Sequence, residues 1–210
     1  MKNIILIISL LFLQLGCKKV EVNNENYIEL VNNCLVEYKI TNNVSLGYKY
    51  YVPKGVKKIK DFDYNQIFLI EDSKVYLYVD VISYFYNRKL SSENKENVFY
   101  FQEFNFNEKQ GFVKIENKEN NEYFVSIVYN YAKIEFYSSY ENLDKLITMS
   151  SIILNSIEYN DAIIEKILEG DFGEFSEFTY EVDKPEDASS NFTQYLEESV
   201  QKEEVEQLPD

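Results

Sequence analysis

Alternation of side chains with a period of two runs through most of residues 44–137, and this feature restricts the fold more than any other. Successive side chains of a β-strand point to opposite faces of a sheet, so the alternation predicts strands. Turn-rich clusters at 71–73 and 118–121 separate the segments, and short turns join antiparallel strands. We therefore expect an antiparallel β-sheet with strands at 46–52, 66–70, 75–86, 98–104, 112–116, 123–129 and 133–137.

The segment 75–86 shows the pattern best. Its odd positions are mostly aliphatic, which predicts a face buried by a helix. Its even positions are mostly tyrosine, which predicts a partly covered face with large amphipathic contact area. The predicted binding face consists of Tyr76, Tyr78, Asp80, Tyr84 and Tyr86.

Apolar residues recur at helical spacing between residues 143 and 157. Such a stripe predicts an amphipathic helix, and Ser138 followed by Glu141 matches a capping box, so we expect Ser138 to cap the start of the helix. Further helices are predicted at 27–36 and at 161–168, the latter stopping at Gly170. The fold class is therefore α+β, an antiparallel β-sheet packed by one or two amphipathic helices.

The first 17 residues read MKNIILIISLLFLQLGC. The apolar run from Ile4 to Leu15 is shorter than the roughly 20 residues that a membrane span needs, and it fits a secretory signal. Gly16 directly before Cys17 resembles the end of a bacterial lipoprotein signal, although the usual leucine three residues before the cysteine is replaced by Gln14.

In that family the cysteine is acylated and becomes the first residue of the mature chain. The resemblance therefore implies lipidation at Cys17 and a lipid anchor on the extracytoplasmic side of the cell membrane, at the cell surface or in the periplasm. A plain secretory signal and an uncleaved amphipathic anchor remain as alternatives. The mature chain would keep Cys34 as its one unmodified cysteine, which we expect to be a small core hydrophobe.

The chain divides into four parts: a signal peptide (1–16), a polar tether (17–26), a globular domain (27–169) and an acidic tail (170–210). From Asp161 onward, 16 acidic residues stand against three lysines, in a chain whose net charge is −15. The tail has too little apolar area to offset its ordering entropy, so we expect it to be largely disordered. Phe172, Phe175, Phe178 and Tyr180 are the exception, and they predict either a transient amphipathic turn or docking on a partner or on the domain's own tyrosine face.

Four lysines give this acidic protein a local positive patch, in what we expect to be a loop around Pro53 and Gly55. A solvated loop, a contact with anionic lipid headgroups and a contact with the acidic tail are all open interpretations. The patch consists of Lys54, Lys57, Lys58 and Lys60.

The absence of histidine removes the commonest general base and metal ligand, and the chain has no recognisable catalytic motif. Asp61, Asp63, Asn65 and Asp72 follow the spacing of a calcium loop, but Gln66 stands where that loop needs glycine, so we expect no metal and no cofactor. The negative charge argues against nucleic-acid binding. A carboxylate-dependent glycan hydrolase centred on Asp80 is the surviving enzymatic alternative.

The order of elements carries a second resemblance. A strand at 48–52 leads into Pro53-Lys54-Gly55, antiparallel strands follow as far as Tyr137, and a closing helix ends in Leu154-Asn155-Ser156-Ile157. Over residues 44–159 this resembles the PsbP-like α/β/α sandwich family. Members of that family include extracytoplasmic and lipid-linked assembly or binding modules, so the resemblance implies a non-catalytic role and assigns no functional residue.

The favoured hypothesis is a membrane-anchored binding or assembly module that contacts an unknown envelope protein or glycan through its tyrosine-rich face. An envelope accessory protein that acts through its acidic tail is the other non-catalytic hypothesis.

Overall fold

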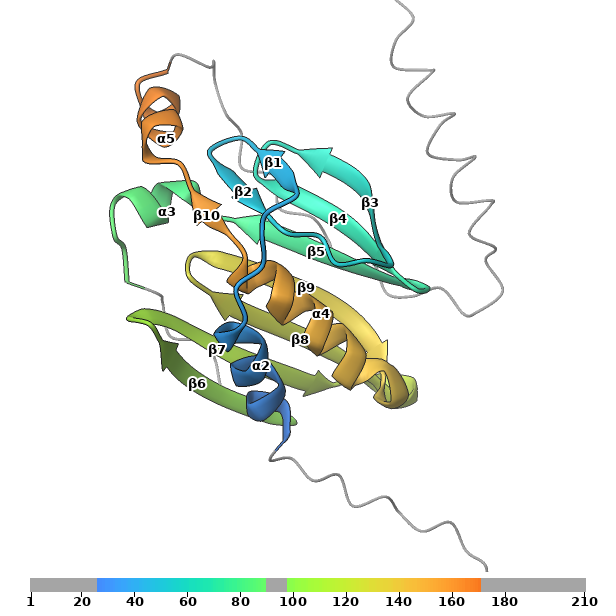
Figure 1. The fold of residues 1–210 in the computed structure, drawn as a ribbon. Helices are drawn as coiled ribbons and strands as arrows, with labels where there is room; N and C mark the ends of the chain where they lie inside the picture. The colour runs from blue at the N-terminus through green and yellow to red at the C-terminus, as the bar shows by residue number, and fades with distance from the viewer. Residues whose placement is uncertain (1–25, 90–97, 171–210) are drawn as a thin grey trace, which may run out of the picture.

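The computed structural model describes residues 26–89 and 98–170. They form an α+β fold, as the sequence predicts, with a seven-stranded antiparallel sheet in the order β3-β4-β5-β9-β8-β7-β6 and a small antiparallel sheet in the order β1-β2-β10 (Figure 1). The strands are β1 (Asn43–Ser45), β2 (Tyr48–Tyr50), β3 (Val56–Phe62), β4 (Asn65–Ile70), β5 (Ser73–Val79), β6 (Tyr100–Phe106), β7 (Lys109–Asn117), β8 (Glu122–Tyr129), β9 (Ala132–Ser139) and β10 (Glu158–Tyr159). The α-helices are α2 (Asn26–Val36), α3 (Val81–Phe85), α4 (Leu143–Asn155) and α5 (Asp161–Leu168).

The main core lies between the large sheet and two helices on the same side of it, α2 and α4 (Figure 1). The register pairs Leu77 with Ile134, so the odd-numbered residues of β5 and the even-numbered residues of β9 share one face of the sheet. This face packs against the two helices. Both side chains are fully buried, and so is Ile147 of α4. The predicted aliphatic face and the two predicted covering helices are therefore confirmed.

The predicted start of the long helix is wrong. Ser138 belongs to β9, and its hydroxyl donates a hydrogen bond to the carbonyl of Ser139 instead of capping a helix. A single 3₁₀ turn at Tyr140–Asn142 follows, and α4 begins at Leu143 without a side-chain cap at Asn142. The strand continues past the capping-box sequence because β9 pairs with β8 as far as Ser139. Pairing across the sheet thus outweighs the local capping signal.

The predicted loop of lysines is also wrong. Lys57, Lys58 and Lys60 lie on β3, an edge strand of the large sheet, and only Lys54 lies in the turn before it. Lysines on an edge strand discourage pairing with another chain. The edge position of β3 therefore explains why this strand carries more charged residues than a buried strand would tolerate.

Within the two described ranges, no helix combines the length and the apolar character needed to cross a membrane. The predicted signal peptide, almost all of the tether, Cys17 and the acidic tail from residue 171 lie outside the described residues.

Candidate functional site

The residues of the predicted tyrosine face lie in two different parts of the structure, because the strand predicted at 75–86 ends at Val79. Tyr76 and Tyr78 remain on β5. Tyr84 lies on the short helix α3, and Tyr86 is the residue that follows its last turn. The five candidate residues therefore do not share one surface.

Asp80 is the reason that the strand ends. Its carboxylate Oδ1 accepts a hydrogen bond from the backbone N–H of Ser83 at 2.7 Å, which makes Asp80 the N-cap of α3. Aspartate is a preferred residue at this position because it satisfies an N–H group that the first turn leaves free. Asp80 is also exposed to solvent. It therefore lacks the buried setting that the glycan hydrolase hypothesis requires of its central acid.

Tyr84 joins an aromatic group at the α3 end of the domain. Its ring stacks on Tyr159 with centroids 3.7 Å apart, and its hydroxyl donates to Asp161 Oδ1 at 3.0 Å. Burial, together with the hydrogen bond to Asp161, raises the pKa of Tyr84. Tyr86 remains 57% exposed, with the Arg88 guanidinium 5.5 Å from its ring centroid. Tyr84 thus holds α3 against the start of α5, whereas Tyr86 is open to solvent.

The other two tyrosines belong to a larger surface, which we call the outer face: the side of the seven-stranded sheet opposite α2 and α4. Tyr76 is only 3% exposed, whereas Tyr78 is half-buried beneath the Lys133 ammonium, 4.9 Å from its ring centroid. The strand register brings further aromatic residues onto this face from β6, β7, β8 and β9. The aromatic side chains of the outer face are Phe62, Tyr76, Tyr78, Phe101, Phe112, Phe124 and Tyr137.

These rings contact one another in pairs across neighbouring strands. Phe124 and Tyr137 lie with centroids 5.0 Å apart, and Phe101 and Phe112 lie 5.7 Å apart. Such pairs stabilise a sheet by roughly 0.2–1 kcal/mol each. They also leave broad half-buried ring surfaces, of the kind that protein interfaces favour.

Charged side chains lie among the rings. Glu116 forms ion pairs with Lys114 at 3.1 Å and Lys118 at 2.5 Å, and Lys133 pairs with Glu135 at 2.9 Å. Burial tends to raise the pKa of Glu116, but hydrogen bonds from the two lysines outweigh it and keep that pKa below its usual value. The lysines outnumber the acids on this face: Lys57, Lys60, Lys74, Lys114, Lys118 and Lys133 stand against Glu103, Glu116, Glu122 and Glu135.

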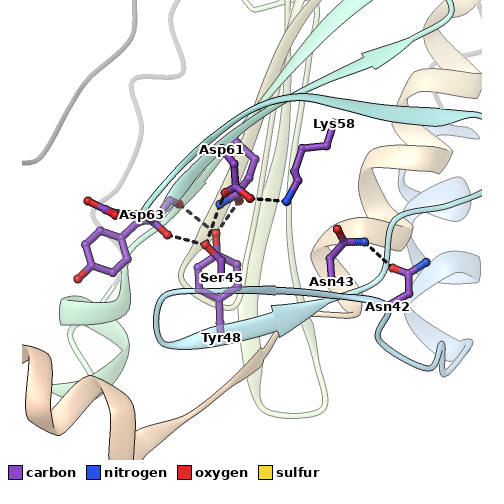
Figure 2. A network of polar contacts seen from close by, with 9 residues as sticks. Asn42, Asn43, Ser45, Tyr48, Lys58, Asp61 and Asp63 are labelled. Carbon is purple, nitrogen blue, oxygen red and sulfur yellow. Dashed lines mark hydrogen bonds and ion pairs between the residues drawn. The ribbon is translucent and has the colours of Figure 1, made fainter. Parts of the chain in front are cut away.

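A polar network on the other side of the sheet has a structural role (Figure 2). Gln66 is buried, yet its amide donates to Ser45 Oγ and Asp61 Oδ1 at 3.0 Å each. Its Oε1 accepts the Tyr48 hydroxyl at 2.5 Å. Every polar atom of Gln66 therefore has a partner, and the network joins the small sheet to the β3–β4 hairpin.

Cys34 is buried, as predicted, and its thiol lies 3.7 Å from the carbonyl oxygen of Thr148 on α4. Burial raises the pKa of this thiol, which disfavours the reactive thiolate. Among the described side chains, no group of three or more His, Cys, Asp or Glu residues is placed to hold a metal ion.

Sequence reasoning missed most of the outer face. The strands that carry Phe112, Phe124 and Tyr137 were predicted, but alternation within a strand does not show which strands are neighbours. The order β5-β9-β8-β7 sets these rings beside Tyr76 and Tyr78. The sequence of each strand shows the alternation, but it does not show the order of the strands in the sheet.

No known protein-family model matches this sequence, and a search among curated proteins finds no match.

Proposed function

We propose that this protein is a lipid-anchored binding module of the cell envelope that contacts its partner through the outer face of the seven-stranded sheet. The observation that carries the proposal is the composition of that face, with half-buried rings and an excess of lysines on the side of the sheet opposite the two covering helices. A few residues carry most of the binding energy at a protein interface, and tyrosine is enriched among them, while surrounding charges select the partner.

The chemistry of this face favours an acidic partner with aromatic groups. An envelope protein with such a segment fits better than a neutral glycan, because ion pairs with lysine add selectivity that an uncharged sugar does not provide.

Site-specific crosslinking in intact cells tests the face. A photoreactive phenylalanine analogue at Tyr137 is expected to give an adduct with another molecule, and Lys133→Glu should reduce its yield. The same analogue at Tyr38 is the control, because Tyr38 is 78% exposed and lies between α2 and β1. Equal adducts from the two positions would contradict a partner surface on the outer face.

The anchor rests on the sequence around Cys17 and is tested separately. The intact mass of the membrane-extracted protein should correspond to a chain that begins at Cys17 and carries acyl groups. A Cys17→Ala variant should be released from the membrane or keep its first 16 residues. An unmodified mass that does not depend on Cys17 would remove the lipid anchor from the proposal and leave the crosslinking result unaffected.

A further inference from the structure

The outer face also has features that suit a segment of the same chain. Four apolar side chains at its centre are less than a tenth exposed, although α2 and α4 lie on the other side of the sheet. They form two cross-strand pairs, Ile67 with Tyr76 and Phe112 with Val128, and β9 lies between the two pairs with Lys133 and Glu135. The apolar surface that this face leaves open belongs to the half-buried rings around these pairs, Tyr78, Phe101, Phe124 and Tyr137, and such rings are suited to contact with another apolar surface.

We infer that residues 171–210 bind this outer face within the same molecule. Charge supports this occupant, since the segment contains 13 acidic residues and only two lysines, Lys184 and Lys202. The outer face has the opposite balance, with six lysines and four glutamates. Complementary charge of this kind favours the encounter and fixes its orientation.

The aromatic residues of the segment supply the apolar half of the contact. Phe172, Phe175 and Phe178 recur every three residues, with Glu174 and Glu177 between them. Rings that alternate with carboxylates match a face on which rings alternate with lysines. The chemistry is the same as that proposed for an external partner, so the segment and the partner compete for one surface.

The position of the segment allows the contact. The described chain ends at Gly170, two residues after α5; α5 packs against α3, and α3 starts where β5 ends. The segment therefore starts beside one end of the large sheet. Its 40 residues reach roughly 130 Å when extended, at about 3.3 Å per residue. Seven strands spaced about 4.8 Å apart span only roughly 29 Å, so length sets no limit.

The absence of tryptophan from the chain gives a direct test. In the full chain, purified in mild detergent, Phe175→Trp introduces the sole tryptophan. Its emission should lie at shorter wavelength than that of a free tryptophan amide and should resist acrylamide quenching. Added Lys133→Glu should shift the emission to longer wavelength and increase quenching. Added Lys145→Glu is the matched control, since Lys145 is a comparably exposed lysine on α4, on the other side of the sheet.

Three results would overturn the inference. The first is emission like that of free tryptophan. The second is an equal response to Lys133→Glu and Lys145→Glu, with both variants folded by circular dichroism. The third is a shift that disappears on dilution, since the tail would then occupy the face of a second copy. The test needs no partner and no lipid, so it can fail while the proposed function stands. A Tyr137 adduct within the chain would support the tail, and an adduct with another molecule would support the proposed function.

Discussion

Asp80 shows how one residue is read differently in sequence and in structure. Within an alternating segment it looked like an acid on a tyrosine face, with a possible catalytic role. In the fold its carboxylate caps α3 and ends β5. Aspartate has a low strand preference and a high preference for helix starts, so the change at this position follows from its short polar side chain. The residues beyond it, from Val81 to Tyr86, also alternate, but they belong to the short helix α3 and its C-terminal cap, so their alternation does not reflect a strand.

This role predicts the effect of two substitutions. Asp80→Ala should lower the free energy of unfolding by about 1 kcal/mol, within the range of about 0.5–2 kcal/mol that lost caps cost. Asp80→Asn should retain nearly all of the stability, because an amide oxygen accepts the Ser83 N–H equally well. Urea denaturation at neutral pH measures both. If asparagine costs as much as alanine, the negative charge matters rather than the capping hydrogen bond.

At the scale of elements, patterns predicted most of the buried segments but not where they end, and they missed the edge strand β3. The strands at 66–70, 123–129 and 133–137 and the helices at 27–36 and 161–168 lie close to β4, β8, β9, α2 and α5. Periodicity identifies such segments because one face of each is buried. Their ends depend on partners that a local pattern does not contain, which is why β9 runs through Ser139 and removes the predicted cap of α4.

Two hairpin turns illustrate the same limit. The β6–β7 and β8–β9 turns each have two central residues with positive φ, Asn107-Glu108 and Asn130-Tyr131. Such turns usually carry glycine at the second position, and neither does here. Asparagine tolerates positive φ, but glutamate and tyrosine are held there by the pairing of the flanking strands. The residues of the β8–β9 turn alone therefore do not predict the tight connection that places Tyr137 beside Phe124.

At the scale of the whole molecule, the core contains several buried tyrosines. Tyr27, Tyr48, Tyr50 and Tyr129 are all less than a tenth exposed. Burial is the main cause that raises the pKa of each of these phenols. For Tyr129 the pKa rises to about 12, while its hydroxyl donates to the carbonyl of Phe106 at 3.2 Å. The core thus depends on phenols that stay protonated.

This dependence predicts a loss of stability at high pH. Below about pH 10 the phenols are protonated in both the folded and the unfolded chain, so they make no difference. Between pH 10 and 12 the unfolded chain loses these protons while the folded chain keeps them, so unfolding releases protons. The free energy of unfolding must then fall as the pH rises. Urea denaturation at a series of pH values from about 9 to 12 measures this fall.

Tyr129→Phe separates the phenols from the other groups that titrate at high pH. The variant should be less stable at neutral pH, because it loses the hydrogen bond to Phe106, yet its stability should fall less steeply above pH 10. Tyr38→Phe is the control, since it also removes one phenol, but from a side chain that is exposed in the folded chain. If both variants keep the slope of the parent chain, lysine deprotonation rather than the buried phenols limits stability in alkali.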